Sequence, residues 1–185
     1  MTDKLQRDPG LALLTLDEMS LYFQATLTRV YAPIGQTPIV RVSPQRDNVH
    51  FYGALEVRTG RGVAVTALEQ TTEVTADFIR LILLLFSTQA ILLLLDRAPW
   101  HFGRAIDQLL DDNPRLELMY FPPACPDLNP QEHVWEQARE AISHNHDCPV
   151  FDRLIDDFDT FLNETPFQSD FMQHYGPPID PAIFD

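Results

Sequence analysis

The chain has 185 residues, of which 45% are hydrophobic, and a formal net charge of −14. This length and apolar content suffice for one core, so we expect a single domain over residues 1–185. Two cysteines, Cys125 and Cys148, exclude a disulfide framework. The N-terminus resembles no secretory signal, and polar residues interrupt the apolar region 78–95. We therefore expect a cytoplasmic protein without a membrane span.

The charge is unevenly distributed, which bears on nucleic-acid binding. Residues 19–68 have a net charge of +3, and residues 145–185 have Arg153 against nine acids, a net of −8. Because affinity for DNA comes from cations that neutralise phosphates, we expect DNA contacts in the N-terminal half. The candidates there are Arg29, Arg41, Arg46, Arg58 and Arg61. The acidic helix and tail over 145–185 either contact a partner or solvate the domain.

The N-terminal half favours strands. An apolar run over 11–16 predicts a buried strand, and 19–23 predicts a second one. Turn residues predict a loop over 31–38. Residues 49–55 and 62–66, which are rich in β-branched and aromatic side chains, predict a hairpin. We expect these first strands to be antiparallel neighbours.

From residue 72 onward, helices alternate with strands. Apolar spacing predicts a helix over 72–86, and an unbroken apolar run predicts a buried strand over 90–95. We expect a loop over 122–130 and a helix that begins at Asn129 as its N-cap and runs to about 143. The remaining elements are a helix over 99–111, a strand over 116–121 and a helix over 150–163. This order predicts an α/β fold with a mixed sheet and helices on both faces.

Three acids adjoin these elements. Asp17 and Asp96 follow apolar strands, and Glu132 lies in the first turn of the helix that begins at Asn129. Because ligands bind at strand ends in open α/β sheets, the three carboxylates are candidates to converge at one sheet edge. Mg²⁺ prefers oxygen ligands, and two such ions can drive displacement at a phosphodiester. The pattern therefore indicates a metal-dependent phosphoryl transferase.

Each acid also has a simpler explanation. Glu132 could complete a capping box with Asn129, and Asp96 could cap the turn after its strand. For Asp17 the alternative is its neighbour Glu18, because strand alternation sends the two side chains to opposite faces of the sheet. His101 could contact DNA or order the site, and a packing or surface role is an equal alternative.

A possible zinc site is the minor interpretation of another group. His144, His146 and Cys148 alternate as potential ligands, and Cys125 is the obvious fourth.

Three segments resemble a known family. Residues 120–135, YFPPACPDLNPQEHVW, resemble the signature around the last acid of mariner-like transposases, in particular the bacterial insertion-sequence IS-six-thirty group. The segment 95–101, LDRAPWH, is similar to the second acidic motif of that family. Residues 16–18 with 31–36 resemble its first motif. The match is ordered and spans residues from about 11 to about 144.

The resemblance implies a ribonuclease H-like fold and an Asp-Asp-Glu site made of Asp17, Asp96 and Glu132. It further implies two Mg²⁺ or Mn²⁺ ions, DNA strand cleavage by water and strand transfer by a DNA 3′ hydroxyl. Arg97 departs from the family, which usually has asparagine after the second acid. We also expect the chain to lack the helix-turn-helix region that recognises transposon ends, which makes it a catalytic half, a frameshift-dependent product or a remnant.

The leading hypothesis is the catalytic domain of a transposase that acts on transposon ends and target DNA. It would work as a homodimer or with full-length transposase, and would be nucleoid-associated when bound to DNA. The alternative is a truncated, non-catalytic relative that serves as an interaction or regulatory module. A ribonuclease H-like nuclease for another nucleic acid would share the same ligands.

Overall fold

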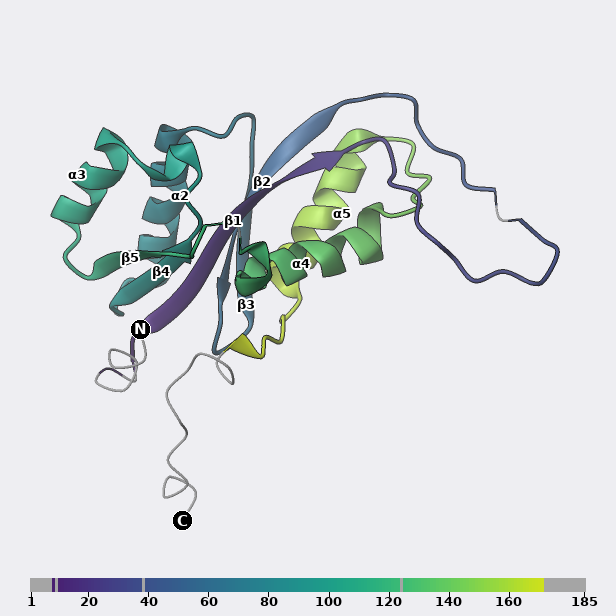
Figure 1. Cartoon of the computed structure of the whole chain (residues 1–185). Helices are drawn as coiled ribbons and strands as arrows, with labels where there is room; N and C mark the ends of the chain where they lie inside the picture. Colours follow the sequence, from purple (N-terminus) through teal and green to yellow (C-terminus); the bar gives the residue numbers. More distant parts are fainter. Residues whose placement is uncertain (1–7, 9, 38, 124, 172–185) are drawn as a thin grey trace, which may run out of the picture.

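A computed structural model describes residues 8, 10–37, 39–123 and 125–171. Its centre is a five-stranded mixed sheet with the strand order β3-β2-β1-β4-β5 (Figure 1). Strands β1 (Ala12–Tyr22), β2 (Asn48–Glu56) and β3 (Arg61–Ala67) are antiparallel neighbours, as the sequence predicted. Strands β4 (Ile91–Leu95) and β5 (Leu116–Tyr120) extend the sheet in parallel with β1.

Helices cover both faces of the sheet, which confirms the predicted architecture. Helices α2 (Thr72–Leu85) and α3 (Arg104–Asp112) pack on one face, over a core that includes Leu14 and Leu93. Helices α4 (Pro130–Ala138) and α5 (Phe151–Glu164) pack on the other face (Figure 1). All five residues of β4 are buried, as expected for a strand with helices on both sides.

The register of the sheet brings two of the acids to one edge. Strands β1 and β4 pair in parallel from Ala12 with Ile91 to Thr15 with Leu94. Two residues beyond the last pair, Asp17 and Asp96 are level with each other. Strand β4 ends there, whereas β1 continues to Tyr22 along β2. Asp17 therefore lies within β1, and the expectation that it ends a strand was wrong.

Three further element boundaries differ from the sequence prediction. The two strands predicted over 11–16 and 19–23 are one strand, β1, because its pairing with β2 continues without a break from Leu14 to Tyr22. The helix predicted over 99–111 is interrupted at Gly103, whose φ of 123° is not helical, so a 3₁₀ turn, η1 (Pro99–His101), precedes α3. Beyond Ala138 the backbone of α4 passes into a π-helical turn, η3 (Arg139–Ser143).

Segment 23–47 projects from the end of β1 and returns to β2 (Figure 1). It contains no helix or strand in its described residues, in agreement with the loop predicted over 31–38. Thr26 makes an isolated bridge to His144. The predicted acidic tail is described only as far as residue 171, and its remainder, 172–185, lies outside the described residues. No helix in the described part of the chain is long and apolar enough to cross a bilayer.

Gly53 allows α4 to lie directly on the sheet. It is opposite Asp17 in the β1–β2 pairing. A Cβ atom at this position would lie 2.3 Å from Cη2 of Trp135 and 2.6 Å from Nε2 of Gln131, closer than a Cβ atom approaches other heavy atoms in proteins. Glycine at 53 therefore sets the depth at which α4 packs.

Replacing Gly53 with alanine should lower the free energy of unfolding by about 1–3 kcal/mol, because the indole of Trp135 is fully buried and has to move. Urea unfolding followed by circular dichroism measures this loss. Gly10→Ala is the matched control, since its Cβ meets only Asp8 at 3.4 Å, and it should change stability by less than about 0.5 kcal/mol. Equal stabilities of the two variants would contradict this packing.

Candidate active site

The three acids singled out by the sequence line one cavity. Asp17, Asp96 and Glu132 border a hollow of about 320 Å³ at the edge of the sheet where β4 ends. They come from β1, from the residue after β4 and from the first turn of α4. Within the described residues, no three ligand side chains are gathered into a ready-made metal cluster. The acids therefore share a cavity without forming a compact cage.

Asp17 is held by a tryptophan and is strongly perturbed. The Nε1 atom of Trp135 donates a hydrogen bond to Asp17 Oδ2 at 2.9 Å. Burial, the charge of Glu132 and the charge of Glu18 raise the pKa of Asp17 to about 7, while the bond from Trp135 acts in the opposite direction. Asp17 and Glu132 are thus close enough to repel each other. A bound cation would relieve this repulsion, and carboxylate oxygens are suitable ligands for a hard divalent ion.

Asn129 fixes the start of α4 against β1, and with it the position of Glu132. The Oδ1 atom of Asn129 accepts a hydrogen bond from the backbone N–H of Gln131 at 3.1 Å, which confirms Asn129 as the N-cap. Its Nδ2 atom donates to the backbone oxygen of Leu16 at 3.2 Å, one residue before Asp17. In the described structure the Glu132 carboxylate makes no capping-box bond, so it remains available to a ligand.

Asp96 is oriented by the turn that follows it. Its Oδ1 atom accepts a hydrogen bond from the backbone N–H of Ala98 at 2.9 Å. The Nδ1 atom of His101 lies 2.9 Å from the same oxygen and 3.2 Å from the backbone oxygen of Asp96. On the other side of the ring, Nε2 of His101 lies 2.9 Å from Glu18 Oε1. Burial lowers the pKa of His101, but its contacts with Glu18 and Asp96 outweigh this and raise the pKa overall.

The chain is similar in sequence to known proteins. Residues 12–155 match the family model described as DDE superfamily endonuclease. The chain belongs to this family. It is 26% identical over 143 residues to the "Insertion element IS630 uncharacterized 39 kDa protein" of Shigella sonnei, a match that covers 75% of this chain and 41% of that protein. It is 29% identical over 119 residues to "Uncharacterized protein y4pE/y4sA" of Sinorhizobium fredii, covering 58% of this chain and 85% of that protein.

Solved structures show the same fold. The Mos1 transposase in a paired-end complex with its left transposon end has a TM-score of 0.66 and 16% identity, with 89% of this chain and 52% of that chain covered. The catalytic domain of Mos1 mariner transposase has a TM-score of 0.59 and 12% identity, with 92% and 78% covered. These likenesses confirm the ribonuclease H-like fold. This chain spans about half the length of the Mos1 chain in the complex.

Several residues of this family member's site were not identified from the sequence. Trp135 was not singled out as a site residue, and Asn129 was expected only as a cap, because a sequence does not show which side chain a helix directs at another element. Arg97 lines the carboxylate cavity, and its guanidinium lies 5.7 Å from the centre of the Tyr120 ring. Its position directly after Asp96 was the signal that could have suggested this placement.

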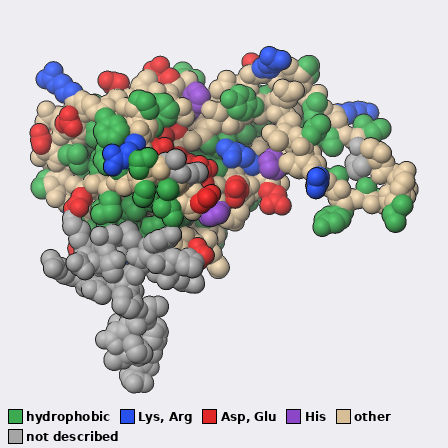
Figure 2. Space-filling model, in the orientation of Figure 1, with side chains coloured by type: hydrophobic (Ala, Val, Ile, Leu, Met, Phe, Trp, Pro, Cys, Tyr) green, Lys and Arg blue, Asp and Glu red, His purple; other side chains and the backbone are tan. Residues whose placement is uncertain are grey.

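The arginines proposed from the sequence fall into two groups. Arg29, Arg41 and Arg46 are exposed on segment 23–47, where Figure 2 shows basic side chains. That segment leaves β1 beyond Asp17, on the side of the sheet edge where the carboxylates lie. Arg58 and Arg61 flank the β2–β3 turn, which follows Glu56; the register pairs Glu56 with Leu14, three residues before Asp17 in β1 and away from the carboxylates. The structure therefore does not bring all five together.

The predicted site residues also include His101 and the zinc-ligand group of His144, His146 and Cys148. The His101 ring is fully buried, with both nitrogens facing oxygens of Glu18 or Asp96, which favours an ordering role over direct contact with DNA. His146 Nδ1 accepts a hydrogen bond from the backbone N–H of Cys148, and burial lowers the pKa of this histidine. Among the described residues, His144, His146 and Cys148 do not form a metal-binding group.

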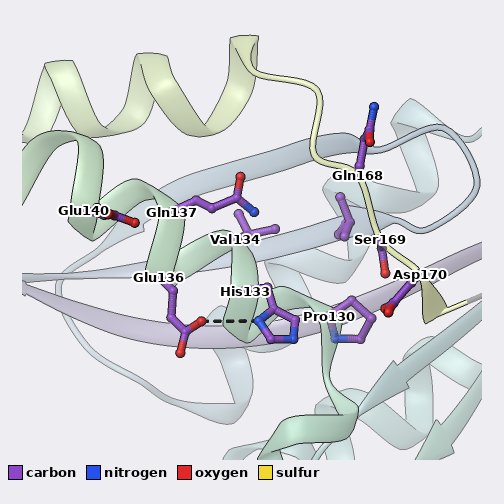
Figure 3. Close-up of a pocket in the computed structure, with 10 residues that line it drawn as sticks. Pro130, His133, Val134, Glu136, Gln137, Glu140, Gln168, Ser169 and Asp170 are labelled. Atoms are coloured by element: carbon purple, nitrogen blue, oxygen red, sulfur yellow. Dashed lines mark hydrogen bonds and ion pairs between the residues drawn. The ribbon is translucent and has the colours of Figure 1, made fainter.

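A larger hollow, of about 450 Å³, lies beside α4 and is separate from the carboxylate cavity. Figure 3 shows side chains of α4 along one side of it and Gln168, Ser169 and Asp170 along the other. His133 and Glu136 form an exposed pair there, with 3.3 Å between Nδ1 and Oε2. Neither Asp17 nor Asp96 lines this hollow. The smaller carboxylate cavity is therefore the candidate active site.

Without metal, Asp17→Asn should stabilise the protein at pH 8 by about 1–3 kcal/mol, because it removes a buried charge and keeps an acceptor for Trp135. Because the pKa of Asp17 is raised, the wild-type protein loses stability as pH rises from 3.8 towards about 7. The stability advantage of the variant should therefore be smaller at pH 5 than at pH 8. Urea unfolding of both proteins at pH 8 and pH 5, in buffer that contains a metal chelator, measures this difference in the free energy of unfolding.

The matched control is Asp127→Asn, which changes an exposed acid in the 3₁₀ turn η2 (Pro126–Leu128). It should leave the stability nearly unchanged at both pH values. A less stable Asp17→Asn protein at pH 8 would show that the ionised carboxylate is favourable in the fold, contrary to this account.

Proposed function

We propose that this chain is a catalytic domain that performs metal-dependent DNA strand cleavage and strand transfer. The observation that carries this proposal is the cavity shared by Asp17, Asp96 and Glu132 within a member of the DDE endonuclease family. The IS630 relative is named for an insertion element, and Mos1 transposase has been solved in a paired-end complex with its left transposon end and in a strand transfer complex. DNA is the substrate that these names support.

We propose Asp17, Asp96 and Glu132 as the ligands of two Mg²⁺ or Mn²⁺ ions. Mos1 paired-end complexes have been solved with each of these metals. The donor set fits, because all three side chains offer carboxylate oxygens and the pKa of Asp17 is raised partly by the charge of Glu132. Bound there, the ions would activate a water or a DNA 3′ hydroxyl and stabilise the leaving oxygen. The described protein groups hold the ligands in position for this: Trp135 holds Asp17, and Asn129 anchors the turn that carries Glu132.

We propose that the DNA backbone follows the projecting segment towards the carboxylate cavity. Arg29, Arg41 and Arg46 offer exposed cations along this route, and Arg97 adds one at the cavity itself. The chain as a whole has a net charge of −14, so DNA phosphates would bind where these arginines lie and would be repelled elsewhere. Arg58 and Arg61 contribute less to this proposal because of their position at the β2–β3 turn.

The same segment supports our proposal that the chain acts as a homodimer or together with a full-length transposase. Its apolar side chains Leu27, Tyr31, Ile34 and Ile39 are each more than 60% exposed. Such a run of exposed apolar side chains is typical of a contact surface. We further propose that the protein works in the cytoplasm and is nucleoid-associated when bound to DNA.

Asp96→Asn should reduce Mn²⁺-dependent cleavage of duplex DNA that carries the element's terminal sequences by at least about a hundredfold, since a lost metal ligand removes several kcal/mol of transition-state stabilisation. Gel analysis of end-labelled DNA measures cleavage, and a shift assay in Ca²⁺ should show unchanged DNA binding. Asp127→Asn should cleave normally. Retained cleavage by the Asp96 variant would remove this residue from the mechanism, and preferential cleavage of an RNA–DNA hybrid would favour the nuclease alternative.

Arg29, Arg41 and Arg46 are changed together to glutamine. The logarithm of DNA affinity should then fall less steeply with the logarithm of salt concentration, by about 2 to 3 in the magnitude of the slope, since each phosphate contact contributes about 0.9. Fluorescence anisotropy with labelled duplex measures the slope, and sedimentation velocity of the same samples measures association between copies. The comparison variant changes Arg58 and Arg61 to glutamine and should leave the slope nearly unchanged. The reverse order of effects would contradict the proposed DNA path.

A further inference from the structure

Glu18 and Asp17 are neighbours in β1 but serve opposite faces of the sheet. Glu18 lies on the face of α2 and α3, and its side chain is only 3% exposed. Both of its carboxylate oxygens are engaged: Trp100 Nε1 donates to Oε2 at 3.0 Å, and Nε2 of His101 lies 2.9 Å from Oε1. Burying a carboxylate costs several kcal/mol unless it is paired, so this arrangement depends on both partners.

His101 connects this buried carboxylate to the candidate metal ligand Asp96. Its side chain is 0% exposed, and its Nδ1 atom lies 2.9 Å from Asp96 Oδ1 and 3.2 Å from the Asp96 backbone oxygen. The ring is therefore fixed from both ends. The backbone oxygen of His101 also accepts a hydrogen bond from the hydroxyl of Tyr120 at 3.3 Å, which connects η1 to β5.

The contacts of Asp96 divide its carboxylate into a held oxygen and a free one. Oδ1 receives the Ala98 N–H and faces His101, whereas in the described part of the chain Oδ2 accepts no hydrogen bond. The side chain is 56% exposed and borders the carboxylate cavity. In metal sites, groups behind the ligands that fix ligand orientation change metal affinity by about 10- to 100-fold when removed.

We propose that His101, anchored by Glu18 and Trp100, is a positioning residue that holds Asp96 with one oxygen directed into the cavity. The inference rests on the proposed function, because it assigns to Asp96 the role of metal ligand. It gives Glu18 a role different from that of Asp17: Glu18 supports the site from the opposite face of β1 and does not bind the ion.

Two substitutions of His101 separate positioning from simple packing. The amide nitrogen of His101→Asn takes about the place of Nδ1 and keeps the contact with Asp96. The amide nitrogen of His101→Gln takes about the place of Nε2 and keeps the contact with Glu18. Each variant loses one half of the bridge, so both should lose thermal stability, but only the glutamine variant should release Asp96.

Calorimetric titration of the whole chain with Mn²⁺ in the absence of DNA tests this. We expect His101→Gln to weaken Mn²⁺ binding by about tenfold or more, and His101→Asn to remain within about threefold of wild type. The control Ile79→Val trims a fully buried side chain of α2 and should leave the affinity unchanged despite lower stability. Equal Mn²⁺ affinities of the two His101 variants would overturn the positioning role.

The same titration distinguishes failure of this inference from failure of the proposed function. If wild type binds Mn²⁺, Asp96→Asn does not, and His101→Gln binds as wild type does, then the metal site stands and the positioning role is wrong. If wild type binds no Mn²⁺, both fail. Should a His101 variant not fold, Trp100→Phe removes only one hydrogen bond to Glu18. It should weaken Mn²⁺ binding by about twofold or more, and unchanged affinity would count against the anchor.

Discussion

The central constraint on this structure is that like charges lie close together at one edge of the sheet. Asp17 and Glu132 repel each other enough to raise the pKa of Asp17, with burial as the larger cause, and the parallel register places Asp96 level with Asp17. Such crowding is unfavourable in the apo protein, so the fold has to supply the stabilisation elsewhere. The buried β4 strand and the cores on both faces provide it.

Each acid is held by a different kind of contact. Asp17 accepts a hydrogen bond from Trp135, whose indole packs directly against Gly53 of β2, where no side chain intervenes. The turn that carries Glu132 is anchored through Asn129 to the backbone of β1. Asp96 is held by a backbone amide and by a histidine that is buried against Glu18. These contacts hold the three acids in place and leave other carboxylate oxygens for a cation. This arrangement is expected of a site that binds metal together with DNA phosphates.

The sequence predicted the parts of this structure that depend on local pattern. The apolar run at 90–95 and the helical spacing at 72–86 match β4 and α2 within a few residues, because both elements bury continuous apolar surface. The helix expected over 99–111 was interrupted because Gly103 adopts a positive φ, which a periodic pattern does not reveal. The three acids that line the candidate site were predicted from their positions beside strands and a helix start, together with the family resemblance. The contacts of Trp135, Asn129 and Glu18 were not, since these join residues 82 to 118 positions apart and exist only once the sheet and α4 have packed.

Anomalous diffraction from crystals soaked in Mn²⁺ tests the central claim most directly, because it locates the ion without relying on activity. The chain has 27 acidic residues, so metal binding in solution does not by itself identify the site. The account predicts anomalous peaks within coordination distance of Asp17, Asp96 and Glu132, and their loss in crystals of Asp96→Asn. Peaks confined to other acids, such as those of α5 or those beside the hollow in Figure 3, would contradict it.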